Sequence, residues 1–165
     1  MKGNKMIDRT TIESGFLQMG LKRGMSLEVH CSLSSFGTVR GGAEAVIVAL
    51  LSIVTNNGNI IMPSFPLSKP QKLTELDRQL GIAFKKKKLP EDSNEKSDMG
   101  IVADTFRRRP DVHTGVGEHR CSAWGKDATK YSEGLQHLIE DDGYALMIGV
   151  DIRLRQEINL TYCVL

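Results

Sequence analysis

The 165-residue sequence is poor in aromatic residues and in cysteine. Aromatic side chains make up 5% of the residues, and the single tryptophan, Trp124, is expected to be a packing anchor rather than a ligand platform. The three cysteines, Cys31, Cys121 and Cys163, form no C-x-x-C pattern, so neither a disulfide framework nor a zinc site is expected. The sequence therefore predicts no metal site, and a reducing cytoplasm is the compartment that fits best.

Long hydrophobic runs and a strong charge of one sign are also missing. The formal net charge is +2, and basic residues gather only in KKKK (85–88) and RRR (107–109), so bulk nucleic-acid binding is weakly supported. No run of about 18 apolar residues occurs and no apolar stretch follows the first lysines, so neither a membrane span nor a signal peptide is predicted. With 40% hydrophobic residues, the composition is typical of one globular domain over residues 1–165.

Helix-like and strand-like segments alternate along the first part of the chain. We expect a first helix capped by Asp8 or Thr10, a strand in MSLEVHCSL, a mostly buried helix over residues 42–54, and a strand in NIIMPSF. The apolar stripe of the first helix consists of Ile12, Phe16, Leu17 and Met19. Strand, glycine loop, helix and strand form one βαβ unit, which implies a parallel sheet flanked by helices.

The later part of the chain begins with a polar stretch. Residues 67–97 have no clear period and are rich in charge, so we expect a long surface loop with a short helix around residues 73–80. Further along, the pattern predicts a helix over 98–109 ended by Pro110, a strand in CSAWG and a short helix over 132–141. The strongly apolar YALMIGVD is expected to be a central strand of the sheet.

The loop between the first strand and the buried helix is the most specific candidate site. Its polar and flexible positions are Ser32, Ser34, Ser35, Gly37, Gly41 and Gly42. Hydroxyls, backbone N–H groups and a helix N-terminus then meet at one point, as they do where proteins hold phosphate or pyrophosphate. The loop matches neither G-x-x-x-x-G-K-[ST] nor G-x-G-x-x-G. The alternative is that serines and glycines merely shape the turn.

Histidines supply the candidates for acid–base chemistry. His30 precedes the serine cluster, so its ring either faces the site or is a satisfied core group. His119 adjoins Glu118 beside an expected sheet edge, where α/β proteins concentrate catalytic groups. His137 lies on an expected surface helix and is predicted to be inert. Cys31 is either a nucleophile or, more commonly for such a residue, a small buried thiol.

The remaining cluster is FRRRP. Three arginines at a helix end suit the helix dipole and usually form a solvated face, and the alternative is phosphate binding.

Four segments, in order, resemble the aminoglycoside 3-N-acetyltransferase family. They are VHCSLSSFGTVRGGAEAVIVALL, NIIMPSF, MGIVADTFRRRPDV, and HRCSAWGKDA followed later by YALMIGVD. The first is close to the family's VHSSLSSFG-then-GGA pattern, and the resemblance covers roughly residues 10–150. Members move an acetyl group from acetyl-CoA to an antibiotic amine. The resemblance implies an α/β fold, a three-layer α/β/α sandwich with a central, largely parallel sheet.

The resemblance also implies a site. Acetyl-CoA is the expected co-substrate, and the residues expected to bind it are His30, Ser32, Leu33, Ser34, Ser35, Val39, Gly41 and Gly42. Acetyl transfer to an amine needs a base and donors for the tetrahedral oxyanion, and the predicted base is His119 oriented by Glu118. The expected partners are CoA and an aminoglycoside, to which Asp98 and Glu95 offer negative charge.

Two departures from the family leave a second function open. The positions matching its HPxHS motif read VGEHR (116–120), so only the histidine at 119 is present. The histidine of its later SxxHxxE segment falls at Thr161 or Tyr162. The alternative is thus a shortened, catalytically inactive CoA-binding relative. The acceptor amine and the oligomeric state stay open.

Overall fold

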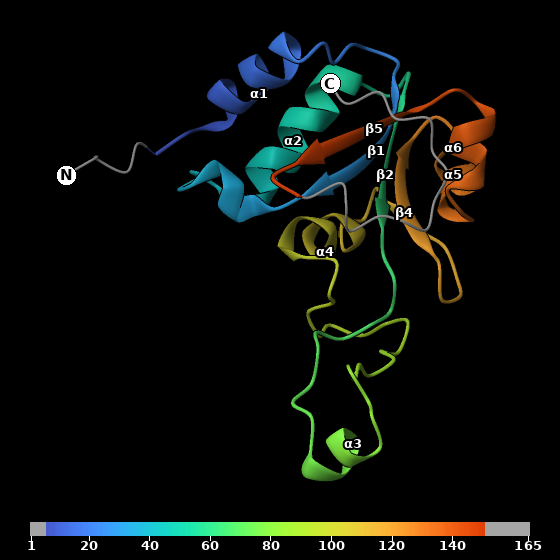
Figure 1. Cartoon of the computed structure of the whole chain (residues 1–165). Helices are drawn as coiled ribbons and strands as arrows, with labels where there is room; N and C mark the ends of the chain where they lie inside the picture. Colours follow the sequence, from blue (N-terminus) through green and yellow to red (C-terminus); the bar gives the residue numbers. More distant parts are fainter. Residues whose placement is uncertain (1–5, 151–165) are drawn as a thin grey trace.

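The computed structural model describes residues 6–150, which fold around a five-stranded sheet (Figure 1). The strands are β1 (Ser26–Cys31), β2 (Asn59–Pro63), β3 (His113–Thr114), β4 (Cys121–Gly125) and β5 (Tyr144–Ile148). Their order is β3-β4-β2-β1-β5, with β1 parallel to both β2 and β5, and with β4 antiparallel to β2 and β3. The α/β fold is therefore confirmed, with a mixed sheet whose parallel part holds the β1–α2–β2 unit.

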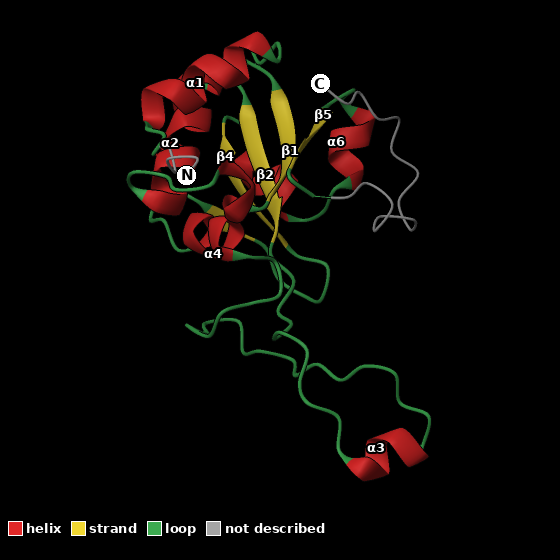
Figure 2. Ribbon diagram, turned by 60° about the vertical axis from the view of Figure 1, so that its left-hand side comes forward, coloured by secondary structure: helices red, strands yellow, loops and turns green. Residues whose placement is uncertain are grey.

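Helices cover both faces of the sheet, which gives three layers (Figure 2). On one face lie α1 (Arg9–Gln18), α2 (Gly42–Val54) and α4 (Ile101–Arg107), and on the other lie α5 (Ala128–Ser132) and α6 (Gln136–Glu140). Alternation along β2 divides the core, since Ile60 and Met62 join the larger cluster under α2 while Ile61 joins the smaller cluster under α5 and α6.

The helix α2 occupies the predicted residues 42–54. It begins at Gly41, whose φ of 86° lies in the left-handed region that favours glycine. Val46, Ile47 and Leu50 are fully buried, and each contributes about 1.5–3 kcal/mol by leaving water. After the helix, Gly58 is required because a Cβ there would lie 2.3 Å from the carbonyl oxygen of Met25. These contacts fix the helix between β1 and β2.

The first helix follows its prediction in part. Asp8 caps α1 by accepting a hydrogen bond from the Thr11 amide at 2.9 Å. Ile12 and Phe16 are buried, but Leu17 is 57% exposed, so the predicted stripe was wrong at that position. The reason is geometric, since Leu17 lies about 100° around the helix from Phe16.

Three other predictions need correction. The strand YALMIGVD was expected to be central, but β5 lies at one edge of the sheet in the described part of the chain, because it pairs only with β1 there. Its apolar run reflects cover on both faces, with Leu146 and Ala145 buried on opposite sides, and does not report a second neighbouring strand. The short helix expected over 132–141 is present only as α6, over Gln136–Glu140, and the preceding helix α5 over Ala128–Ser132 was not predicted. The helix expected over 98–109 begins only at Ile101.

The polar stretch 67–97 forms an arm that projects from the body, with α3 (Glu75–Gln79) at its tip (Figures 1 and 2). The predicted surface loop with a short helix is confirmed. All four lysines of the run KKKK pair with carboxylates: Lys85 with Asp77, Lys86 with Asp98, Lys87 with Glu95, and Lys88 with Glu118. The run therefore holds the arm together and ties it to the body.

Candidate active site

The candidate loop lies at the carboxyl end of β1, between that strand and α2. The turn η1 (Leu33–Phe36) is a short 3₁₀ helix in which the Ser35 hydroxyl donates to the carbonyl oxygen of Ser32 at 2.7 Å. The hydroxyl oxygens of Ser32 and Ser34 lie 3.0 Å apart. These bonds shape the turn, and they leave lone pairs on each hydroxyl for a ligand.

The second half of the loop leads into the N-terminus of α2. Val39 forms a parallel bridge with Ile7, and the Gly42 amide donates to the Val39 carbonyl oxygen at 3.1 Å. Gly41 provides no side-chain cap. The first turn of α2 therefore begins from glycine backbone, and the predicted residues Gly41 and Gly42 lie where backbone N–H groups are not capped by a side chain.

The residues at and directly after the end of β5 contact the serine turn. The Ser32 amide donates to the Ile148 carbonyl oxygen at 2.9 Å. Gly149 packs so closely that a Cβ on it would lie 2.1 Å from the Cβ of Ser35. The loop's position thus depends on a glycine directly after β5, which the sequence interpretation did not single out.

Cys31 is partly buried against the larger core cluster, which is closer to the buried-thiol alternative than to an exposed nucleophile. Burial raises the pKa of its thiol to about 12, so the group is uncharged at neutral pH. Because the thiolate is the nucleophilic form, the nucleophile alternative for Cys31 is disfavoured.

His30, predicted to bind the co-substrate, is joined to an acidic residue that the sequence interpretation missed. Its Nε2 lies 2.6 Å from Oε1 of Glu28, whose side chain is fully buried, while the imidazole is 21% exposed. Both residues lie on β1, two positions apart, and so on the same face of the strand. A carboxylate two residues before a histidine in a predicted strand is the signal that could have found the pair.

His119 and Glu118 lie in the hairpin between β3 and β4, and both are exposed. The His119 ring meets the edge of Phe65, with ring centroids 5.5 Å apart. Glu118 accepts from Lys88 at 3.0 Å, a bond that lowers the pKa of its carboxyl, and no hydrogen bond joins Glu118 to His119 within residues 6–150. The role of His119 as base stays a prediction, while the orienting bond from Glu118 is not formed.

The other predicted groups serve the scaffold. His137 on α6 faces Glu133 and Glu140 at the surface. Trp124 packs against the larger core cluster, as expected of an anchor. Asp98 and Glu95, expected to attract a cation, are paired with lysines of the arm.

The three arginines of FRRRP are engaged with protein groups. Arg107 pairs with the buried Asp104 and, with Arg108, donates to carbonyl oxygens at the base of the arm. Arg109 pairs with Glu44 and Asp111. The arginines are therefore neither a free solvated face nor a free phosphate site.

Metal ligands and membrane-spanning helices are both missing from residues 6–150. No three histidine, cysteine or acidic residues come together there as metal ligands, and no helix in that range has the length and apolar character needed to span a membrane. Thr161 and Tyr162, which match the position of the later family histidine, lie outside the described residues.

Comparison with known proteins identifies the family. The model of the family described as aminoglycoside 3-N-acetyltransferase matches residues 29–154. A relative from Bacillus subtilis (strain 168), the SPbeta prophage-derived aminoglycoside N(3')-acetyltransferase-like protein YokD, is 30% identical over 89% of this chain and 64% of its own length. The chain belongs to the aminoglycoside 3-N-acetyltransferase family.

Solved structures agree with this fold. A binary complex of AAC-IIIb with CoASH superposes with a TM-score of 0.67 at 18% identity, covering 87% of this chain and 59% of that one. A mutant of AAC(3)-IVa in complex with a gentamicin gives 0.75 at 22% identity, covering 97% and 61%. The chain thus spans about three fifths of the length of these relatives.

Proposed function

We propose that the protein transfers the acetyl group of acetyl-CoA to an amino group of an aminoglycoside, with CoA lying along the loop from Ser32 to Gly42. The observation that carries the proposal is the strand, serine turn and glycine-led helix at the carboxyl end of β1, which is also where the family match begins. Carboxyl ends of parallel strands are where open α/β sheets bind ligands.

The names of similar proteins support the choice of substrates. One structure holds CoASH, and others hold a gentamicin and apramycin. The predicted contacts to CoA are His30, Ser32, Leu33, Ser34, Ser35, Val39, Gly41 and Gly42, and the base predicted from the sequence is His119. The proposed partners are these two small molecules and not nucleic acid or a membrane. We place the reaction in the cytoplasm, where acetyl-CoA is available.

The direct test is release of CoA thiol by the purified chain in the presence of acetyl-CoA and a panel of aminoglycosides. Thiol release that depends on both substrates, with mass spectrometry of the singly acetylated product, is the expected result. Absence of release with every aminoglycoside would contradict the proposal.

A variant tests the location of the CoA site. Gly149→Val places a branched side chain against Ser35 and should displace the serine turn, weakening CoA binding at least about tenfold by titration calorimetry. Gly15→Ala is the matched control, because its Cβ meets nothing within 4 Å. Equal CoA affinity in the two folded variants would place CoA elsewhere.

The second candidate function is CoA binding without transfer. The absence of the first histidine of the HPxHS motif at Val116 favours it. Calorimetric CoA binding with no thioester cleavage by any aminoglycoside is its signature, and turnover would exclude it.

A further inference from the structure

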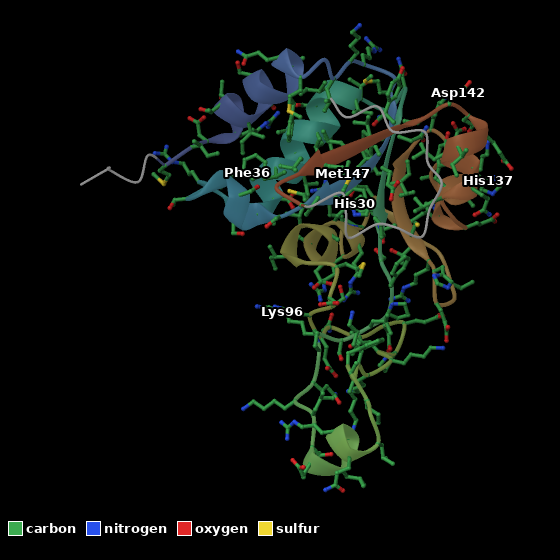
Figure 3. The ribbon with its side chains drawn as sticks, viewed as in Figure 1. His30, Phe36, Lys96, His137, Asp142 and Met147 are labelled. Carbon is green, nitrogen blue, oxygen red and sulfur yellow. The ribbon has the colours of Figure 1, made fainter. Side chains whose placement is uncertain are left out.

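Glu28 and His30 form a pair in which the glutamate is buried and the histidine reaches the surface. Glu28 is fully buried, and its Cα partners across the sheet are the apolar Ile61 and Ala145. The His30 side chain keeps 21% of its surface exposed and lies beside Met147 of β5, its Cα partner (Figure 3). Water or a ligand can therefore reach the imidazole but not the carboxylate.

Burial of the Glu28 carboxylate is unfavourable for the free energy of folding unless the group has a partner. On the face of the sheet to which Glu28 points, its Cα partners Ile61 and Ala145 are apolar. A buried carboxylate is tolerated only when it is paired and hydrogen-bonded, and here His30 lies 2.6 Å away. This geometry holds the imidazole in one orientation at the carboxyl end of β1.

The contact with Glu28 determines which ring nitrogen is left for a ligand. Nε2 of His30 faces the carboxyl group, and a base at this position needs the tautomer in which Nε2 carries the hydrogen and Nδ1 keeps its lone pair. Of the other histidines in the described residues, His113 is exposed, His137 faces exposed carboxylates and His119 contacts a phenyl ring. Among residues 6–150, His30 alone is held by a fully buried carboxylate.

We propose that His30 is the general base of acetyl transfer and that Glu28 is the residue that positions it. This inference rests on the proposed function. Along the extended strand His30 lies about 7 Å from Ser32, so a base at this position borders the loop proposed to hold CoA.

The acetyl transfer needs only the acceptor amine, acetyl-CoA and the imidazole of His30. The acceptor nitrogen attacks the thioester carbonyl carbon and gives its proton to Nδ1 of His30. The carbon–sulfur bond breaks, the CoA sulfur leaves with the electron pair, and the imidazolium returns the proton to it. The products are the amide and CoA thiol, and His30 is again neutral.

The test compares His30→Ala with His119→Ala, with His137→Ala as the matched surface control. We expect His30→Ala to lower kcat by about 10²–10⁴-fold, because a base acts in the transition state, whereas loss of a contact to CoA alone would raise KM for acetyl-CoA without lowering kcat. Added imidazole should restore part of the lost kcat in His30→Ala. Full activity in His30→Ala beside loss in His119→Ala would overturn the inference in favour of the base predicted from the sequence.

Glu28 is tested separately. Glu28→Gln keeps the shape and removes the charge, so kcat should fall at constant KM, and imidazole should not rescue it because the ring is still present. If this variant does not fold, Glu28→Leu fits the apolar surroundings and serves the same purpose. Nitrogen-15 NMR of the wild-type imidazole should show hydrogen on Nε2, and hydrogen on Nδ1 would overturn the proposed geometry.

The two proposals fail in different ways. No thiol release by the wild-type chain overturns both of them. Thiol release by the wild type with unchanged kcat in His30→Ala and Glu28→Gln overturns only the assignment of the base.

Discussion

The molecule contains two histidine–glutamate neighbours, and they are built differently. Glu28 and His30 are two residues apart on β1, whereas Glu118 and His119 are adjacent in an exposed hairpin. Residues at i and i+2 of a strand share a face, so the first pair meets at 2.6 Å. Glu118 instead pairs with Lys88 of the arm. Adjacency in sequence is thus a poor guide to contact, and alternation along a strand is a better one.

The difference between the two pairs is tested most strongly by replacing each glutamate with lysine and comparing the stability of the two variants. Glu28→Lys puts an ammonium group into a fully buried position, and we expect a loss of about 3–5 kcal/mol of unfolding free energy. Glu118→Lys changes an exposed side chain and should leave the thermal unfolding midpoint nearly unchanged. Denaturant unfolding of both variants checks this, and equal stability would show that the Glu28 environment is not dry.

The sequence predicted the elements around the Glu28–His30 pair but did not predict the pair itself. The helix 42–54 was found because a nearly continuous apolar run lies between the pair Gly41–Gly42 and Gly58. The serine turn was located because serines and glycines separate this helix from the strand before it. Glu28 was missed because one carboxylate inside an apolar strand gives a weak signal until the face it shares with His30 is considered.

The sequence did not predict which charged residues that lie far apart along the chain form ion pairs. The lysines of KKKK find carboxylates from residue 77 to residue 118, and the arginines of FRRRP reach the base of the arm and α2. Such partners depend on how the arm returns to the body, which no local period reports. Gly149 is a similar case, since its need for close packing appears only when β5 lies beside the serine turn.

Cys31 provides a second test of how dry the environment of the Glu28–His30 pair is, because it is the partly buried residue that follows His30 on β1. With a pKa of about 12, its thiolate fraction at pH 8 should be about 1000-fold below that of an ordinary cysteine. Alkylation by iodoacetamide, followed by peptide mass spectrometry of the fragment that contains Cys31, should be correspondingly slow in the folded protein and fast in denaturant. Rapid alkylation of folded protein would show that the carboxyl end of β1 opens readily.

The smallest expected effect lies at the exposed pair. The hydrogen bond from Lys88 holds the pKa of Glu118 below its ordinary value, so Lys88→Ala should raise that pKa toward the ordinary value. Because the folded-state pKa is depressed, the stabilising contribution is present above the unfolded pKa and fades as pH falls through the folded one. Both side chains are more than half exposed, so solvent screens the pair and the effect on stability should be slight. Carboxyl carbon-13 NMR titration of Glu118 in wild type and Lys88→Ala measures the shift, with Lys72→Ala as control. An unchanged titration would mean that the arm does not hold Glu118, which would leave that carboxylate available to His119.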